Sequence, residues 1–130
     1  MYEELIEAAK AARLRAYAPY SNFLVGAAVL TRSGKLFPGC NIENSSYGAT
    51  ICAERVALGN AYAHGERELA AIAIVADTPT LCPPCGICRQ VLFELGGGHF
   101  DIVLANLRGD VRVFTPAKLL PEAFSQAFLT

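Results

Sequence analysis

The chain has 130 residues, of which 53% are hydrophobic and 18% charged, and its formal net charge is −1. This length suits one domain, and the balanced charge argues against a polynucleotide partner, because phosphate binding needs clustered Lys and Arg. No apolar stretch is long enough to span a membrane, and the acidic start MYEELIEAAK is unlike an export signal. We therefore predict one cytoplasmic domain over residues 1–130, whose five cysteines are thiols or metal ligands. The high apolar fraction indicates that other subunits cover part of the surface.

The first elements in chain order are a helix and a strand hairpin. Residues 3–17 predict the helix, which ends before Pro19. Its apolar positions recur at helical spacing: Leu5, Ala9, Ala12 and Ala16. Residues 23–31 and 36–42 predict two strands, and the Gly-containing turn between them makes the pair antiparallel.

The rest of the chain alternates between helices and strands. The predicted order is a helix over 52–65, a buried strand over 69–77, a Pro-rich loop over 77–84, a helix over 85–98, strands over 101–107 and 111–115, and a helical turn or two within 116–124. This order predicts an α/β fold, a three-layer αβα sandwich with a mixed five-stranded sheet. Both central helices begin at a cysteine directly after a strand or loop, where α/β proteins tend to bind ligands.

Three cysteines occupy every third position in LCPPCGICRQ. Cys82 precedes a proline, which steers it out of the helical region, whereas Pro84 suits the start of a helix. Cys85 and Cys88 then lie on one face of the first helical turn, where two sulfurs can share a metal and the helix N-terminus lowers thiol pKa values. Cys52 begins the other central helix.

If the two helix starts face each other, Cys52, Cys85 and Cys88 supply three sulfur ligands. Three protein ligands leave a tetrahedral zinc one open position for water, as catalytic sites require. Glu54 would stand beside that water as a carboxylate that is not a ligand, which proton transfer requires. Arg55 would offset the excess negative charge of three thiolates on one Zn²⁺.

Other interpretations of these residues remain open on spacing alone. The C-x-x-C pair also suits a thioredoxin-like redox dithiol, and a fourth ligand from Cys82 would close a structural zinc site. Cys40 is expected to be a buried small hydrophobe. His64 and His99 are expected to be cap or loop residues beside glycines.

The motif CAE, followed at a distance by PCGICRQ, resembles the zinc-dependent cytidine deaminase family in its small homotetrameric form. The resemblance extends through AYAPYSNFLVGAAV, GCNIENSSYG, CAERVAL and LLPEAF, which together span nearly the whole chain. It implies a cytidine deaminase-like fold, one Zn²⁺ per chain, and hydrolysis of cytidine and 2′-deoxycytidine to uridine or deoxyuridine and ammonia in pyrimidine salvage. It also implies a homotetramer whose subunits share active sites.

The resemblance assigns roles to individual positions. For the metal centre these are the Zn²⁺ ligands Cys52, Cys85 and Cys88, the general acid and base Glu54, and a thiolate contact from Arg55. For the substrate they are Phe23 against the pyrimidine ring, Asn41 and Glu43 on the ribose hydroxyls, the Ala53 N–H on the base carbonyl, and Tyr47 and Phe124 reaching a neighbouring subunit's site. The family often has serine where this chain has Pro83, and a proline keeps the backbone carbonyl that faces the departing amino group.

Three rival functions are distinguishable. An aminonucleoside-antibiotic deaminase of the blasticidin-S-like type shares CAE and PCGxCRQ, whereas NIEN and the upstream Phe23 suit a ribose. A zinc-stabilised structural module needs neither Glu54 nor an open coordination position. A thiol oxidoreductase would form a disulfide between Cys85 and Cys88 without zinc.

Overall fold

A computed structural model describes residues 1–129. Its elements follow the predicted order: α1 (Glu3–Arg13), β1 (Val25–Thr31), β2 (Leu36–Cys40), α2 (Ala53–Ala63), β3 (Leu69–Ala76), α3 (Gly86–Gly96), β4 (Asp101–Ala105), β5 (Val111–Phe114) and α4 (Pro116–Leu119). Short 3₁₀ turns lie at Tyr47–Ala49 and Gln126–Leu129. Within residues 1–129, no helix has the length and apolar content that crossing a membrane requires.

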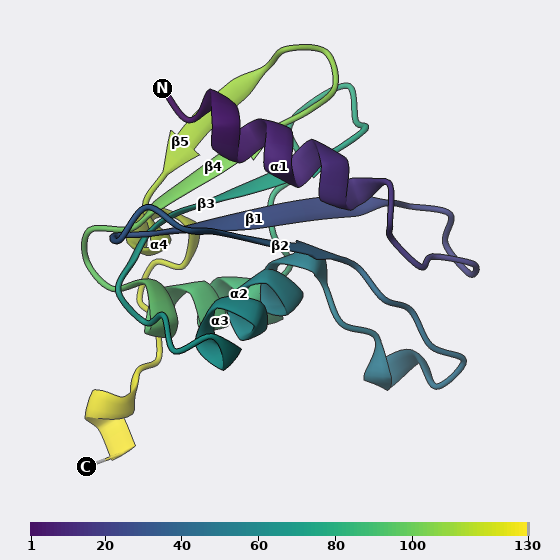
Figure 1. The fold of residues 1–130 in the computed structure, drawn as a ribbon. Coiled ribbons are helices and arrows are strands. Elements are labelled where there is room, and N and C mark those ends of the chain that lie inside the picture. Colours follow the sequence, from purple (N-terminus) through teal and green to yellow (C-terminus); the bar gives the residue numbers. More distant parts are fainter. Residues whose placement is uncertain (130) are drawn as a thin grey trace.

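The strands form one mixed sheet in the order β2-β1-β3-β4-β5. β3 and β4 run parallel, with Ile72 opposite Ile102, whereas each of the other neighbouring pairs is antiparallel. α1 covers one face of the sheet, and α2 and α3 cover the other (Figure 1). The predicted three-layer fold with a mixed five-stranded sheet is therefore confirmed. Because α3 connects the two parallel strands, its N-terminus lies near the end of β3, at an edge where such folds place ligands.

Glycines in the sheet allow the helices to approach it closely. On the α1 face, a Cβ at Gly26 would lie 2.8 Å from the Arg13 Cα. On the other face, a Cβ at Gly39 would lie 2.7 Å from the Ala53 carbonyl oxygen. Both distances are shorter than any normal carbon contact. A larger residue at Gly39 would therefore displace α2 and the first residues of that helix.

The first helix is shorter than predicted, because residues beyond Arg13 pair with the segment after β2. The prediction extended the helix over 3–17, whereas α1 ends at Arg13. The Tyr17 N–H donates to the Asn41 carbonyl at 3.0 Å, and the Tyr17 carbonyl accepts from the Glu43 N–H at 2.8 Å. These bonds form a short parallel β-bridge, so non-local backbone pairing overrides the helical pattern.

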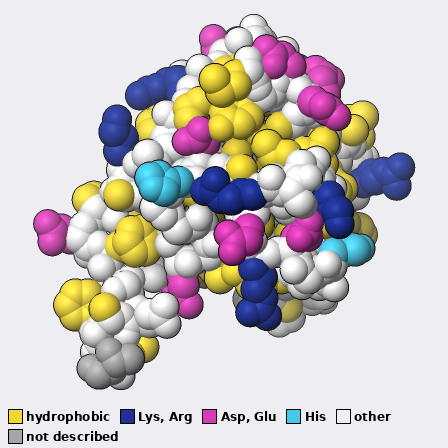
Figure 2. Space-filling model, turned by 60° about the vertical axis from the view of Figure 1, so that its left-hand side comes forward, with side chains coloured by type: hydrophobic (Ala, Val, Ile, Leu, Met, Phe, Trp, Pro, Cys, Tyr) yellow, Lys and Arg dark blue, Asp and Glu magenta, His cyan; other side chains and the backbone are white. Residues whose placement is uncertain are grey.

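The C-terminal helix is also shorter than predicted. α4 stops at Leu119, ahead of Pro121, and Glu122 has a left-handed backbone conformation with φ 55°. Helical structure within 116–124 is therefore present only in the first part of that range, because a proline and a left-handed residue both interrupt a helix. The chain beyond α4 projects from the body of the molecule (Figure 1), and apolar side chains lie exposed on it (Figure 2).

Two smaller predictions are corrected. Cys85 has an extended backbone (ψ 168°) and caps α3, so Pro84 precedes the cap instead of starting the helix. Cys40 is partly exposed rather than buried, because it lies on β2, an edge strand of the sheet. α3 ends at Gly96, and Gly97 follows it with a φ of 76°, a backbone conformation that glycine adopts readily.

Candidate metal centre

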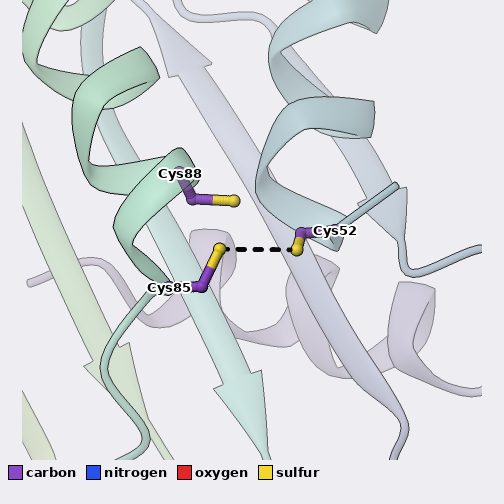
Figure 3. A group of neighbouring side chains, drawn as sticks. All are labelled: Cys52, Cys85 and Cys88. Atoms are coloured by element: carbon purple, nitrogen blue, oxygen red, sulfur yellow. Dashed lines mark hydrogen bonds between the residues drawn. The ribbon is translucent and has the colours of Figure 1, made fainter. Parts of the chain in front are cut away.

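Three thiols converge from two helices on the same face of the sheet. Cys52 caps the N-terminus of α2, Cys85 caps α3, and Cys88 lies in the first turn of α3. Their sulfur atoms all lie within 4.8 Å of one another, and the Cys52 and Cys85 sulfurs are 3.7 Å apart. Figure 3 shows the three side chains pointing toward a common centre. The two helix starts therefore face each other as predicted.

The three thiols suit a zinc ion. Zinc bonds thiolate sulfur at about 2.3 Å, so tetrahedral geometry places two bound sulfurs about 3.8 Å apart, which agrees with the 3.7 Å between Cys52 and Cys85. Cys82 is not a member of the group, and its sulfur lies 3.7 Å from the Pro83 carbonyl oxygen. The described residues thus form the predicted three-sulfur site, which leaves one tetrahedral position open, rather than a closed four-sulfur site.

Hydrogen bonds and positive charge favour the thiolate form of Cys52. The hydrogen bond from the Cys88 thiol lowers the pKa of Cys52 to about 5, with further contributions from Arg55 and Cys85. The Arg55 Nη2 lies 3.6 Å from the Cys52 sulfur. The bond to Cys52, together with burial, raises the pKa of Cys88. A thiolate at Cys52 is therefore available to a cation at neutral pH.

A buried carboxyl group lies beside the thiols. Glu54 is the second residue of α2 and is only 4% exposed. Burial raises the pKa of its carboxyl, and the negative charge on Cys52 adds to this effect. The neighbouring Cys88 side chain acts in the opposite direction and offsets part of this rise. A raised pKa makes this carboxyl easier to protonate, which suits a group that acts as both general acid and general base.

The Asn41 side chain holds the segment that carries Phe23. Its Oδ1 accepts from the Val25 N–H at 2.9 Å, and its Nδ2 donates to the Phe23 carbonyl at 2.8 Å. Asn41 is buried, with 8% exposed, whereas Phe23 is 40% exposed. Asn41 therefore fixes the backbone beneath an accessible aromatic ring, a structural role that sequence reasoning did not foresee.

Glu43 is bound by the loop that precedes Phe23. Its Oε1 accepts from the Tyr20 N–H at 3.0 Å and the Ser21 N–H at 3.1 Å, and its Oε2 accepts from the Ser21 hydroxyl. The Ser21 hydroxyl bond is the main cause that lowers the pKa of Glu43. These residues line an open hollow of about 320 Å³ together with Tyr47 and Thr50. No role was predicted for Ser21 or Tyr20, although the segment PYSNF contains both.

The two aromatics predicted to serve a neighbouring subunit are strongly exposed. Tyr47 is 74% and Phe124 is 56% exposed. Tyr47 packs edge-on against Tyr20 at the hollow beside Glu43, with ring centroids 5.7 Å apart. Phe124 stacks on Phe128 within the C-terminal projection, with centroids 5.9 Å apart. Neither ring is buried within its own chain, which leaves both free to pack against another.

The residues with predicted backbone roles, Ala53 and Pro83, lie at the starts of the two central helices. Ala53 is buried at the first position of α2, where a helix has N–H groups without partners inside the helix. Pro83 is exposed, and the carbonyl of Pro84 accepts from the Arg89 Nε at 2.8 Å. Arg89 also donates to the Leu119 carbonyl at 2.9 Å, so it fixes both the Pro-rich loop and the end of α4. Sequence reasoning assigned no role to Arg89.

These features define an α/β protein in which three converging thiols could hold a metal ion beside a buried carboxyl group. The family model described as the cytidine and deoxycytidylate deaminase zinc-binding region matches residues 1–104. A cytidine deaminase from Sporosarcina psychrophila is 51% identical over 128 residues, which cover 98% of this chain and 94% of that protein. A crystal structure of cytidine deaminase from Burkholderia pseudomallei is 58% identical with a TM-score of 0.93, and the match covers 95% of this chain and 99% of that one. The crystal structure of cytidine deaminase from Mycobacterium tuberculosis is 40% identical with a TM-score of 0.83. This match covers 95% of this chain and 97% of that one.

The chain therefore belongs to the cytidine and deoxycytidylate deaminase family defined by this zinc-binding region. The matched range contains Cys52, Cys85 and Cys88, which form the metal group in the structure. Both the family resemblance of the sequence motifs and the expected zinc cofactor are confirmed.

Proposed function

We propose that this protein hydrolyses cytidine and 2′-deoxycytidine to uridine and deoxyuridine, with release of ammonia, as an enzyme of pyrimidine salvage. The observation that carries the proposal is the buried Glu54 carboxyl beside three converging thiols in a chain of this family. Hydrolysis at a C–N bond of a cyclic amidine needs these parts: an activated water and a group that moves protons to and from the substrate.

Glu54 has two proton transfers to perform. A zinc ion held by Cys52, Cys85 and Cys88 would supply a nucleophilic water at neutral pH, because zinc lowers the pKa of water from about 15.7 to about 7. Glu54 would take a proton from this water and deliver it to N3 of the base, which would make C4 electrophilic. Once the oxygen of this water has bonded to C4, Glu54 would take the remaining hydroxyl proton and deliver it to the amino nitrogen, which leaves a carbonyl at C4 when the C–N bond breaks. The C4–N bond then breaks and ammonia leaves.

The remaining residues would hold the substrate. Phe23 supports the pyrimidine ring, the Ala53 N–H binds the base carbonyl, and the Pro83 carbonyl faces the amino group. Asn41 and Glu43 bind the ribose hydroxyls. After its bonds to the backbone, Asn41 still has one amide hydrogen and one oxygen lone pair for this purpose. Because a site built to bind a hydroxyl discriminates against ligands that lack it, cytidine should be used far better than free cytosine.

We further propose a homotetramer whose subunits complete each other's sites. Its support is the exposed apolar surface at Tyr47 and on the C-terminal projection, where Phe124, Phe128 and Leu129 are each more than half exposed. A projection of this kind gains stability from burial against another subunit.

Charge supports a small-molecule substrate rather than a polynucleotide. On the face drawn in Figure 2, basic side chains lie among acidic ones and form no continuous basic patch. All five cysteines are free thiols, which supports our placement of the protein in the reducing cytoplasm.

The test is ammonia release from cytidine by the purified protein, before and after a chelator removes its zinc. We expect release to stop on zinc removal and to return when Zn²⁺ is added. A protein that holds one zinc per chain and releases no ammonia would contradict the proposal and leave the zinc structural. Turnover of a blasticidin-S-like aminonucleoside, without turnover of cytidine, would identify an antibiotic deaminase instead.

A further inference from the structure

The hydroxyl of Ser21 links the two residues proposed to meet the nucleoside, Glu43 and Phe23. It donates to the Glu43 Oε2 and accepts from the Phe23 N–H at 3.0 Å. We propose that Ser21 is a positioning residue that holds this carboxylate and this aromatic ring as one preformed unit for binding a nucleoside. The proposal rests on the proposed function, because it assumes that Glu43 binds the sugar.

The two oxygens of Glu43 are held in different ways. Oε1 accepts from the backbone N–H groups of Tyr20 and Ser21, which any residue at position 21 except proline would supply. Oε2 accepts from the Ser21 hydroxyl, which depends on the side chain. Ser21 therefore controls the orientation of Oε2 specifically.

Counting acceptor positions shows which oxygen is open to a ligand. An ionised carboxylate has about four lone-pair positions. The hydrogen bonds within residues 1–129 fill both positions on the Glu43 Oε1 and one on its Oε2. The remaining position is on Oε2, the oxygen that Ser21 orients, and both residues line the open hollow. A sugar hydroxyl that donates to Oε2 would therefore meet an acceptor whose orientation is already fixed by Ser21.

The link to Phe23 is local and depends on the conformation of one residue. Asn22, between Ser21 and Phe23, has a left-handed backbone with φ 58°, which asparagine tolerates better than most residues. In this conformation the Phe23 N–H reaches the Ser21 hydroxyl two residues earlier, as in a serine turn. Preforming the unit lowers the entropy lost when the nucleoside binds.

The test compares Ser21→Ala with the wild type in steady-state deamination of cytidine. We expect the alanine variant to raise KM about tenfold, because it removes a hydrogen bond to a charged group, and to change kcat by less than about threefold. Ser21→Thr keeps a hydroxyl and should restore KM, whereas Ser21→Cys, a weaker donor, should give an intermediate value. In a Glu43→Ala background the alanine change should raise KM by a smaller factor than in the wild type, because the bond to Oε2 is already absent and only the bond to the Phe23 N–H remains to be lost.

A matched control is available at a distance from the site. The Ser33 hydroxyl donates to the Glu66 Oε1 at 2.6 Å, so Ser33→Ala removes the same kind of bond and should leave KM unchanged. Melting temperature and zinc content establish folding for each variant, and the threonine and cysteine variants decide the matter if the alanine variant is unstable. An unchanged KM in Ser21→Ala, or an equal effect on KM in both Glu43 backgrounds, would overturn the positioning role of Ser21. The proposed function would still stand in that case if the wild type releases ammonia from cytidine. A wild type that releases no ammonia from cytidine overturns both.

Discussion

The Arg55 guanidinium bridges Cys52 and the residue two positions before it. Its Nη2 lies 3.6 Å from the Cys52 sulfur and 3.5 Å from the Thr50 carbonyl oxygen. Three thiolates on one Zn²⁺ leave a net charge of −1, and a half-buried guanidinium against one of the sulfurs offsets it. The bond to the Thr50 carbonyl also holds the backbone that leads into α2. Arg55 therefore influences both the charge at the Cys52 sulfur and the position of Cys52.

Replacing Arg55 with alanine should therefore weaken the metal centre. We expect Arg55→Ala to lose zinc affinity by roughly 10–100-fold, or to slow turnover, as for other residues that support metal ligands. Competition with a chromogenic chelator measures the affinity. Arg32→Ala is the control, because Arg32 donates to the His99 carbonyl at a distance from the thiols. Unchanged affinity together with unchanged turnover would remove Arg55 from the mechanism.

Glu54→Gln should abolish proton transfer while preserving the fold. Glutamine has nearly the same shape but cannot exchange a proton as a carboxyl does, so kcat should fall by at least about 100-fold. Zinc content and melting temperature should stay close to those of the wild type. The exposed Glu94→Gln on α3 is the control and should keep full activity. A Glu54→Gln enzyme with more than about a hundredth of the normal rate would contradict a central proton shuttle.

Two serine variants distinguish the thiols of the Pro-rich motif. Cys88→Ser should lose most of the bound zinc, because Cys88 belongs to the three-sulfur group. Cys82→Ser should retain about one zinc per chain, because its sulfur lies outside that group. Elemental analysis after dialysis gives both values directly. Zinc loss in Cys82→Ser comparable to that in Cys88→Ser would indicate a four-sulfur site.

The pH dependence of alkylation should reveal the Cys52 thiolate in zinc-stripped protein. Because its pKa is lowered to about 5, this thiol stays largely ionised as the pH falls from 8 to about 6 and becomes protonated only below about 5. The iodoacetamide rate at Cys52, measured by peptide mass spectrometry, should be nearly flat over this range. A peptide thiol with a pKa of about 8.5 would slow about tenfold per pH unit. Zinc added first should protect Cys52, and a steep slope at this residue would refute the lowered pKa.

Mixing two inactive variants tests whether sites are shared between subunits. In Phe124→Ala the proposed tetramer would lack the partner aromatic, and in Glu54→Gln it would lack the proposed proton shuttle. Co-refolded mixtures should recover part of the wild-type rate, since some sites then combine an intact Glu54 from one chain with an intact Phe124 from another. Activity no higher than the sum of the two separate variants would show that each chain supplies its own site.

The metal centre was more accessible to sequence reasoning than the residues that surround the substrate. Cys85 and Cys88 lie in one helical turn, so local spacing is enough to bring their sulfurs together. Ser21 bonds a carboxylate 22 positions away, and nothing in the local sequence of Ser21 marks that partner. The end of α1 was missed for the same reason, because Tyr17 pairs with the segment 41–43 rather than continuing a helix. The contact of Cys52 with Cys85 and Cys88 was predictable across distant segments because metal-binding residues stand at the starts of both helices.

Cys52 and Cys85 precede and follow β3 in the chain, 33 positions apart, and β3 is the central strand of the sheet. An ion bound by both residues closes a loop of backbone that contains β3. Such a loop restricts the unfolded chain much as a disulfide does, and the folded state must release the ion before α2 and α3 can separate. Bound zinc would thus slow the opening of the central part of the sheet in addition to its role in catalysis. The backbone amide hydrogens of β3 should therefore exchange with solvent faster once zinc is removed.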